Sequence, residues 1–207
     1  QSVFHVIAIS PDETAIPKLT CIAQAGGGHY TAVSDAPALT AFAARTFAEA
    51  FGADNRPEDM QAHLASSYNV PQQTRELIDP GIATLLALQG ETLWAYAQVR
   101  RQKPPACVTQ ERPIELRRFY VDHRVHGKGV AQRLMAAVHA AARAFSAQHL
   151  WLSVWERNPR AIAFYKKEGF ADVGRKDFYV GKDCQSDRVL VAAVRPSRPD
   201  AASSRHP

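Results

Sequence analysis

Cysteine is scarce in this sequence, and its spacing excludes the sites that cysteine commonly builds. Cys21, Cys107 and Cys184 lie far apart and form no CxxC pair. Disulfide frameworks and structural zinc sites need several cysteines at short, paired spacings. We therefore expect reduced thiols. His123 and His126 have no second ligand at metal spacing, so we predict no metal site.

Long apolar runs are also missing. No stretch approaches the ~20 uninterrupted apolar residues that a membrane helix needs. The start of the chain lacks the charged segment and apolar core of a secretory signal. These absences predict a cytoplasmic protein that does not bind a membrane, and they leave open a monomer or a homodimer.

The charge balance is basic. The chain has 25 Lys and Arg against 20 Asp and Glu, which gives a net charge of +5. Such a chain attracts polyanions, either a nucleic acid or a phosphorylated cofactor. No aromatic-interleaved RNA motif accompanies Arg117 and Arg118, so we interpret them as strand-surface charges and expect no nucleic-acid partner. A nucleic-acid binder would instead show strongly salt-dependent retention on DNA.

Composition divides the chain into three parts. Residues 1–28 hold an apolar strand-like run, a segment that can be helical, and a break at the three glycines that end it. This part resembles the closing strand, helix and glycine turn of a von Willebrand A-type domain without its metal motif, and we interpret it as an N-terminal appendage or remnant. Residues 29–195 form the main domain. Residues 196–207, rich in Pro, Ser and Arg, predict a disordered tail.

The main domain alternates helices and strands. Apolar residues at helical spacing, proline starts and glycine stops predict its helices, while short β-compatible runs between turns predict its strands. Ser34 or Asp35 can cap the first helix. The strands are expected at 29–33, 82–88, 91–100, 114–122, 149–156 and 187–194, and the helices at 37–51, 57–67, 71–79, 127–147 and 159–167.

The segment RVHGKGVA, residues 124–131, lies between a predicted strand and the long helix. Free backbone N–H groups and the helix dipole favour an anion at a helix start. Gly127 and Gly129 allow the backbone to approach a ligand, and Arg124 and Lys128 can add positive charge. By itself, however, a GxG after a strand is often only a tight turn.

Two rival phosphate motifs fail. The sequence has no GxxxxGKS/T motif, and Gln132 stands where a GxGxxG pattern would need its third glycine. The segment from Arg124 to Gly129 instead matches the pyrophosphate motif Q/R-x-x-G-x-G/A of the GNAT superfamily of acyl-CoA-dependent N-acyltransferases. The segment WLSVWERNPRAIAFYKKEGF resembles that family's strand, asparagine turn and AxxFYxxxGF helix. The resemblance covers roughly residues 29–195.

The resemblance implies an α/β fold of layered α+β type. In this GNAT fold, a central mixed, mostly antiparallel sheet of six to seven strands is flanked by about four helices. It also implies acetyl-CoA as co-substrate, with no metal. The cofactor-binding residues that it implies are Phe119, Tyr120, Val121, Arg124, Val125, His126, Gly127, Lys128, Gly129, Val130, Ala131, Asn158 and Tyr165.

The catalytic residues follow from the needs of acyl transfer, which requires oxyanion stabilisation and proton movement. The Val121 N–H is the candidate oxyanion donor. Tyr165 resembles the family's proton donor to the thiolate, and we expect it to face the cleft while Phe164 enters the core. Glu115 is either a general base acting through water or a solvated strand residue. Asn158 is either a contact of the CoA arm or a helix cap.

Other residues near these motifs have weaker claims. Trp155 and Glu156 either shape the acceptor entrance or bind a cation. Trp151 and Trp155 are equally compatible with plain packing. His123 and His126 are assigned to the surface or to phosphate contact.

These observations predict an acetyl-CoA-dependent N-acetyltransferase that acts by direct transfer on a primary amine of a small molecule or on a peptide N-terminus. The segments ELRRFYVD and WLSVWERNPRAIAFY resemble the branch that includes microbial polyamine acetyltransferases, so a polyamine-like acceptor is expected first. The alternative is a catalytically idle CoA-binding module that acts in regulation or by association.

Overall fold

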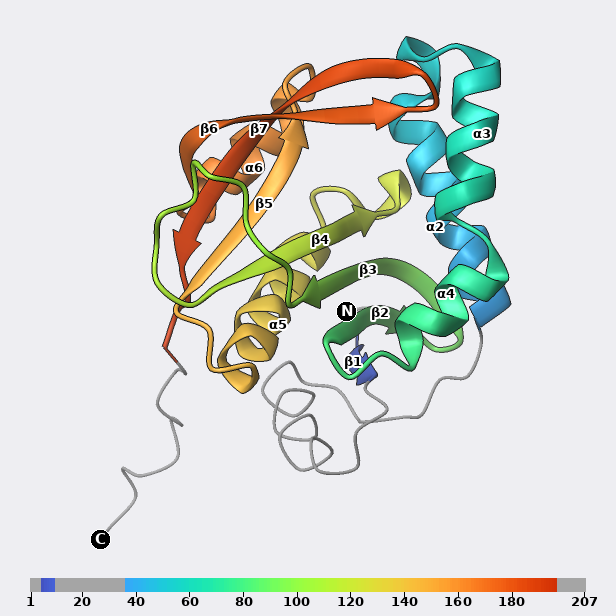
Figure 1. Cartoon of the computed structure of the whole chain (residues 1–207). Coiled ribbons are helices and arrows are strands. Elements are labelled where there is room, and N and C mark those ends of the chain that lie inside the picture. The colour runs from blue at the N-terminus through green and yellow to red at the C-terminus, as the bar shows by residue number, and fades with distance from the viewer. Residues whose placement is uncertain (1–4, 10–35, 197–207) are drawn as a thin grey trace, which may run out of the picture.

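A seven-stranded sheet organises the molecule (Figure 1). The computed structural model describes residues 36–196 together with the backbone of residues 5–9. The strand order is β1-β2-β3-β4-β5-β7-β6, antiparallel except where β4 meets β5. The strands are β1 (His5–Ile9), β2 (Ile82–Gln89), β3 (Thr92–Arg100), β4 (Pro113–Val121), β5 (His149–Trp155), β6 (Ala171–Val180) and β7 (Asp183–Ala193).

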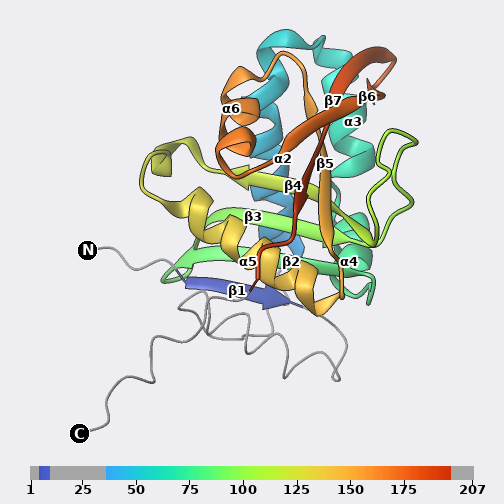
Figure 2. The same ribbon diagram turned by 90° about the vertical axis from the view of Figure 1, so that its left-hand side faces the viewer.

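Helices cover both faces of the sheet. Figure 2 shows α5 and α6 on one side and α3 and α4 on the other. Pro57 and Pro159 occupy the first turns of α3 and α6, where a missing N–H costs nothing. The described helices are α2 (Ala36–Phe51), α3 (Pro57–Ser67), α4 (Val70–Leu77), α5 (Val130–Ala144) and α6 (Pro159–Lys167), with short 3-10 turns η1 (Gly52–Asp54) and η2 (His123–Val125).

Two hydrophobic cores follow from the alternation of side chains along the strands. On the α5 face, Leu134 and Val138 pack against Leu85, Leu116 and other buried strand residues. Burying each such side chain contributes roughly 1.5–3 kcal/mol. On the opposite face, the apolar side of α2 packs against the alternate residues of β2 and β3, as the cluster Leu39, Phe42, Phe47, Leu86 and Tyr96.

The sheet opens between β4 and β5. Parallel pairing joins only Pro113–Glu115 to His149–Trp151. Beyond these residues β4 stays paired with β3 up to Val121, whereas β5 stays paired with β7 up to Trp155. The two strands therefore spread apart (Figure 1), and the backbone edges that face each other across this gap are left without a strand partner.

The expected fold class is confirmed, with five α-helices in the described residues where about four were expected. Strand β6 had not been assigned. The long helix begins at Val130 and not at Gly127, because Gly127 and Gly129 have φ of 76° and 77°.

The ends of the chain are only partly described. Backbone residues His5–Ile9 form the sheet-edge strand β1, antiparallel to β2. The predicted strand at 29–33, the caps Ser34 and Asp35, the glycine break and the tail from 197 lie outside the described residues. The division at 28 and 195 therefore stays a prediction.

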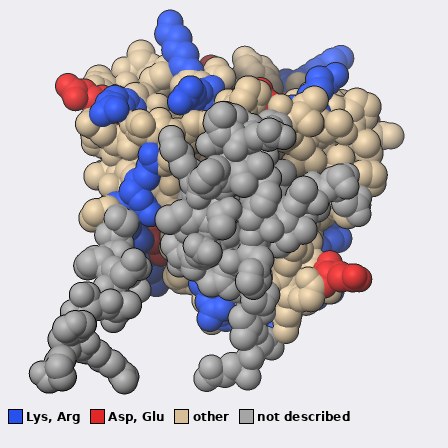
Figure 3. Space-filling model, turned by 90° about the horizontal axis from the view of Figure 1, so that it is seen from below, with Lys and Arg blue, Asp and Glu red and all other residues tan. Residues whose placement is uncertain are grey.

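The surface carries its positive charge in separate groups. Figure 3 shows lysines and arginines spread over the described part of the face seen there, not joined in one patch. None of the helices in the described ranges combines the length and hydropathy that crossing a membrane requires.

Candidate active site

A cavity of about 820 Å³ lies at the gap between β4 and β5. Its walls come from α2, α3, β4, the loop after β4, the end of β5, α6 and the β6–β7 hairpin. Of the residues expected at the site, those that line it are Glu115, Phe119, Tyr120, Val121, Val125, His126, Gly127, Gly129, Val130, Ala131, Asn158 and Tyr165. The fold thus brings most of the predicted residues together.

The backbone at the end of β4 faces the gap at alternate residues. The Asp122 N–H donates to the Trp94 carbonyl at 2.9 Å, so Asp122 directs its backbone toward β3. Because successive residues of a strand direct their backbone groups to opposite edges, Phe119 and Val121 direct theirs into the gap. Tyr120 faces β3, so its backbone is not free for a ligand.

The loop after β4 leads a helix start into the same cavity. No side chain caps α5, whose N-cap is Gly129. The first N–H groups of a helix have no partner within the helix, and the dipole makes this end positive. Val130, Ala131 and Gln132, the first residues of α5, line the cavity. This arrangement suits an anionic ligand.

The positive side chains at the loop differ from those expected. Arg124 and Lys128 do not line the cavity. The Arg124 guanidinium instead donates to Asp122 at 2.9 and 2.7 Å and lies over the Trp94 ring, 4.9 Å from its centroid. The Arg124 guanidinium is thus paired with Asp122, and neither side chain lines the cavity, so their expected contribution to an anion site stays a prediction.

Arg160, at the start of α6, supplies a positive charge that the sequence reasoning missed. It lines the cavity, and its Nη1 lies 3.0 Å from His126 Nδ1. His126 Nε2 lies 3.1 Å from the Val121 carbonyl, which can only accept a hydrogen bond. Nε2 therefore carries the proton, and Nδ1 accepts from Arg160. This chain of contacts joins β4, the loop and α6.

Asp122 fixes the loop to the rest of the fold. Its side chain is fully buried and accepts hydrogen bonds from the Arg124 backbone N–H and from Arg45 of α2, at 3.0 and 2.7 Å. The hydrogen bonds of the Arg124 guanidinium, helped by Arg45, hold the pKa of this carboxyl well below its usual range. The carboxylate is therefore charged at any pH near neutral.

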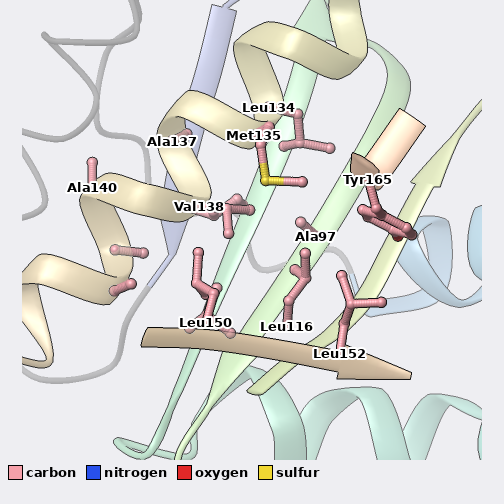
Figure 4. Close-up of a cluster of buried hydrophobic side chains, with 14 of the residues drawn as sticks. Ala97, Leu116, Leu134, Met135, Ala137, Val138, Ala140, Leu150, Leu152 and Tyr165 are labelled. Atoms are coloured by element: carbon pink, nitrogen blue, oxygen red, sulfur yellow. The ribbon is translucent and has the colours of Figure 1, made fainter. Parts of the chain in front are cut away.

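Tyr165 lies at one end of the core cluster on the α5 face, and Figure 4 shows its ring extending from α6 toward the sheet. It is 8% exposed, and its hydroxyl forms no hydrogen bond with the described residues. Burial raises its pKa, so the phenol keeps its proton. Tyr165 lines the cavity and Phe164 packs against the core cluster, as expected, but Phe164 also lines the cavity and Tyr165 is the more buried of the two.

Glu115 and Asn158 have partners within the protein. Glu115 is 5% exposed and pairs with Arg100 of the neighbouring strand, so it is not a solvated strand residue. The Asn158 side chain accepts from the Ala161 N–H at 3.0 Å and caps α6, while also lining the cavity. Both expectations for Asn158 are thus compatible with its position.

Some of the remaining expected residues line the cavity, and others are buried in the core or lie on the surface. Trp155 lines the cavity, whereas Trp151 is 2% exposed and belongs to a separate buried cluster. Glu156 is exposed and does not line the cavity. His123 lines it and approaches Glu49 at 3.3 Å. The described residues contain no cluster of three or more side chains that suits a metal ion.

The far end of the cavity is aromatic, and sequence reasoning did not identify it. The centroid of the Phe47 ring lies 4.7 Å from that of the His63 ring and 5.2 Å from that of the Tyr68 ring. The centroid of the Phe178 ring, from β6, lies 5.6 Å from that of His63. Burial, with the nearby Arg118, lowers the pKa of His63. Phe47 belongs to the buried apolar side of α2 and also lines the cavity. Its second role depends on β6, which is distant in sequence.

Comparisons with known proteins agree with this geometry. The model of the Acetyltransferase (GNAT) family matches residues 44–170. An uncharacterized N-acetyltransferase of Mycobacterium tuberculosis is 33% identical over 159 residues, 77% of this chain and 97% of that protein. A spermine/spermidine N(1)-acetyltransferase of Bacillus subtilis is 34% identical over 66 residues, 31% of this chain and 43% of that protein.

A comparison of structures finds the same fold in solved acetyltransferases. The crystal structure of the PaiA N-acetyltransferase of Thermoplasma acidophilum, in complex with coenzyme A, matches with a TM-score of 0.61 at 17% identity. The match covers 77% of this chain and 92% of that one. By its sequence over the gap-forming strands and the glycine loop, this chain belongs to the GNAT family of acetyltransferases.

Proposed function

We propose that this protein transfers an acetyl group from acetyl-CoA directly to a primary amine. One observation carries the proposal: the uncapped start of α5 and the free backbone edge of β4 meet in one cavity. The first can receive a pyrophosphate and the second an amide-bearing arm. Coenzyme A has both groups, and the relative from Thermoplasma was solved with it.

The cofactor would lie along the gap. The backbone N–H groups of Gly127, Gly129, Val130 and Ala131 would hold the pyrophosphate, with Arg160 adding charge. The Lys128 N–H already donates to the Val125 carbonyl. The backbone groups of Phe119 that face the gap would pair with a pantetheine amide, in the way that a missing strand would, and the Val121 N–H would remain for the thioester oxygen, because the Val121 carbonyl already accepts from His126. Asn158, already the cap of α6, has its amide N–H groups left for the same arm.

The chemistry uses three groups of the chain. The neutral amine attacks the thioester carbonyl, and the Val121 N–H stabilises the negative oxygen that forms. When the C–S bond breaks, the Tyr165 hydroxyl donates its proton to the departing thiolate. After the attack, the nitrogen gives up its extra proton through water, with Glu115, which also pairs with Arg100, as the nearby base. That proton balances the one that Tyr165 gave to the thiolate, and the phenolate is reprotonated from solvent.

The acceptor is a small, slender amine, polyamine-like, in preference to a peptide N-terminus. The tip of the β6–β7 hairpin is held against the α2–α3 region by Gln185 to Asn55 and by the Lys182 N–H to Asp59, at 2.6 and 2.8 Å. This contact holds the hairpin, which contributes Phe178 and Gln185 to the cavity wall, next to the α2–α3 region. The partial similarity to the Bacillus subtilis polyamine enzyme supports the same choice.

The test is a thiol-release screen with acetyl-CoA against polyamines, aminoglycosides, amino acids and N-terminal peptides. Desulfo-CoA should raise the melting temperature, because it binds only the folded state. Tyr165→Phe should lower kcat by about 100-fold or more and leave the desulfo-CoA shift unchanged. If desulfo-CoA binds but no amine releases thiol, the chain is a CoA-binding module and not an enzyme. If Tyr165→Phe leaves thiol release unchanged, its role as acid is wrong.

A further inference from the structure

Two buried carboxylates line the cavity, and they differ in their partners. Glu115 pairs with Arg100. Asp187 is 5% exposed, yet its Oδ1 has no hydrogen-bond partner among the described residues. A buried polar atom without a partner costs free energy, so its presence at a cavity wall needs an explanation. A ligand that donates to it supplies one.

The register of the strands places Asp187 among ligand-facing side chains. Its Cα partners are Trp155 on β5 and Lys176 on β6, and directly paired residues project from the same face of a sheet. All three side chains line the cavity. The Trp155 ring meets the Phe51 ring of α2 edge-on, with centroids 5.8 Å apart. Asp187 thus lies beside aromatic surfaces that suit a cation or an aliphatic chain.

The charges around Asp187 leave it free for a cation. Burial is the main cause that raises its pKa, and Glu156 adds to the rise, while the Ser153 hydroxyl and Lys176 oppose it. Lys176 forms no ion pair within the described ranges and lies over the Trp151 ring, 5.8 Å from its centroid. A cationic ligand would favour the charged form of the carboxyl and so oppose the effect of burial.

The hairpin that carries Asp187 is fixed in place. Gln185, two residues before it, bonds to Asn55, and the turn at Gly181 lies so close to Asp59 that a Cβ there would come within 2.3 Å of its Oδ1. The wall that bears Asp187 is therefore docked on α3. The side chains of Phe51 from α2, Trp155 from β5 and Lys176 from β6 line the same cavity as Asp187.

We propose that Asp187 binds a second, non-reacting ammonium group of the acceptor, an inference that rests on the proposed acetyl transfer. Strand β5 lies between β7 and the gap, and neighbouring strands are about 4.8 Å apart. The reacting amine must lose its proton, and a carboxylate stabilises the protonated form. Asp187 therefore suits the distal amine, and the acceptor is an aliphatic diamine or longer polyamine.

The first test compares putrescine with butylamine, which differ mainly in the distal ammonium. The wild type should have a kcat/KM at least tenfold higher for putrescine. Asp187→Asn should abolish this preference, chiefly by raising KM for putrescine, and should leave the values for butylamine within about twofold. Asp177→Asn is the matched control, because Asp177 is an exposed β6 residue outside the cavity, and it should keep the preference.

A second variant separates ligand binding from an internal ion pair. Lys176→Met removes the cation opposite Asp187, and it should lower KM for putrescine because it removes a competitor for the carboxylate. If Lys176→Met instead raises KM as Asp187→Asn does, the two residues form a structural pair and the proposal is overturned. Calorimetric titration of putrescine into the desulfo-CoA complex gives the same comparison without turnover.

The outcomes distinguish this inference from the proposed function. If no amine releases thiol from acetyl-CoA with the wild type, the proposed function fails. If amines are acetylated but the wild type does not prefer putrescine to butylamine, Asp187 does not bind the distal ammonium. The same conclusion follows if Asp187→Asn keeps the preference for putrescine while its melting temperature rises normally with desulfo-CoA.

Discussion

Replacing Asp122 tests whether one buried carboxylate holds the glycine loop in place. Asp122 joins three parts of the fold: the end of β4, the loop through Arg124, and α2 through Arg45. Asp122→Ala removes every acceptor at once. Glu49→Gln is the control, because Glu49 also pairs with Arg45 but is 39% exposed.

The expected loss of stability depends on which of the hydrogen-bond partners of Asp122 water can replace. The Arg124 N–H loses its acceptor, which costs about 1 kcal/mol. Arg45 is 37% exposed, so its ion pair contributes only about 0.5 kcal/mol. The Arg124 guanidinium is largely in solvent, and we count nothing for it. Asp122→Ala should therefore lower the free energy of unfolding by about 1.5 kcal/mol, and Glu49→Gln by no more than about 0.5 kcal/mol.

The effect should also depend on pH with a defined sign. The folded protein holds the pKa of Asp122 below its usual range, chiefly through Arg124. Its contribution is therefore complete above the unfolded value of about 3.9 and is lost as the pH falls toward the folded value. The stability difference between wild type and Asp122→Ala should be constant from about pH 8 to 5 and shrink in stronger acid.

Urea unfolding at several pH values measures both quantities, and desulfo-CoA titration measures the loop. Asp122→Ala should weaken desulfo-CoA binding several-fold, because the start of α5 is no longer held in place. The reasoning is refuted if Asp122→Ala destabilises no more than Glu49→Gln, or if the difference grows in acid.

Three further substitutions test other parts of the site. Gly129→Ala should cost about 1–2 kcal/mol because its φ is 77°, and it should weaken desulfo-CoA binding; equal affinity would remove the loop from the cofactor site. Asn158→Ser should keep the α6 cap within about 0.5 kcal/mol yet weaken desulfo-CoA several-fold; unchanged affinity would leave Asn158 as a cap alone. Gly181→Ala should displace the hairpin from Asp59 and raise KM for the amine without changing desulfo-CoA affinity, as kinetics and titration will show.

Much of the fold was predictable because its signals are local. Pro57 and Pro159 mark helix starts, and the alternation around Leu85 and Leu116 marks strands, from a few neighbouring residues. Gly127 and Gly129 were correctly placed at the cavity, since their positive φ serves a backbone approach that the motif itself requires. The helix boundary was wrong by three residues because the same glycines form a turn before α5 begins.

The side-chain roles were less predictable because they depend on partners distant in sequence or on competing pairings. Arg124 was expected to contact an anion, but Asp122 lies two residues away and accepts its guanidinium. Tyr165 lines the cavity as expected, but its burial could not be predicted, because the rings of Phe119 and Phe170 pack against it. Asp187 gave no signal at all, since only the register of β7 with β5 places it opposite Trp155.

The net charge of the chain is a poor guide to its cavity for the same reason. Arg117 and Arg118 line the cavity, but both donate to Glu76, at 2.6 and 2.8 Å, and Arg100 pairs with Glu115. Because a carboxylate lies next to each of these arginines, their positive charge is largely neutralised and attracts an anion only weakly. In the proposed function, an anionic cofactor would therefore be held by the backbone at the start of α5 and by Arg160. A cationic acceptor would be held by Asp187, the cavity carboxylate that has no arginine partner in the described residues. A chain with a basic net charge would then bind ligands of opposite charge in one cavity, because its arginines on β3 and β4 are already paired with carboxylates.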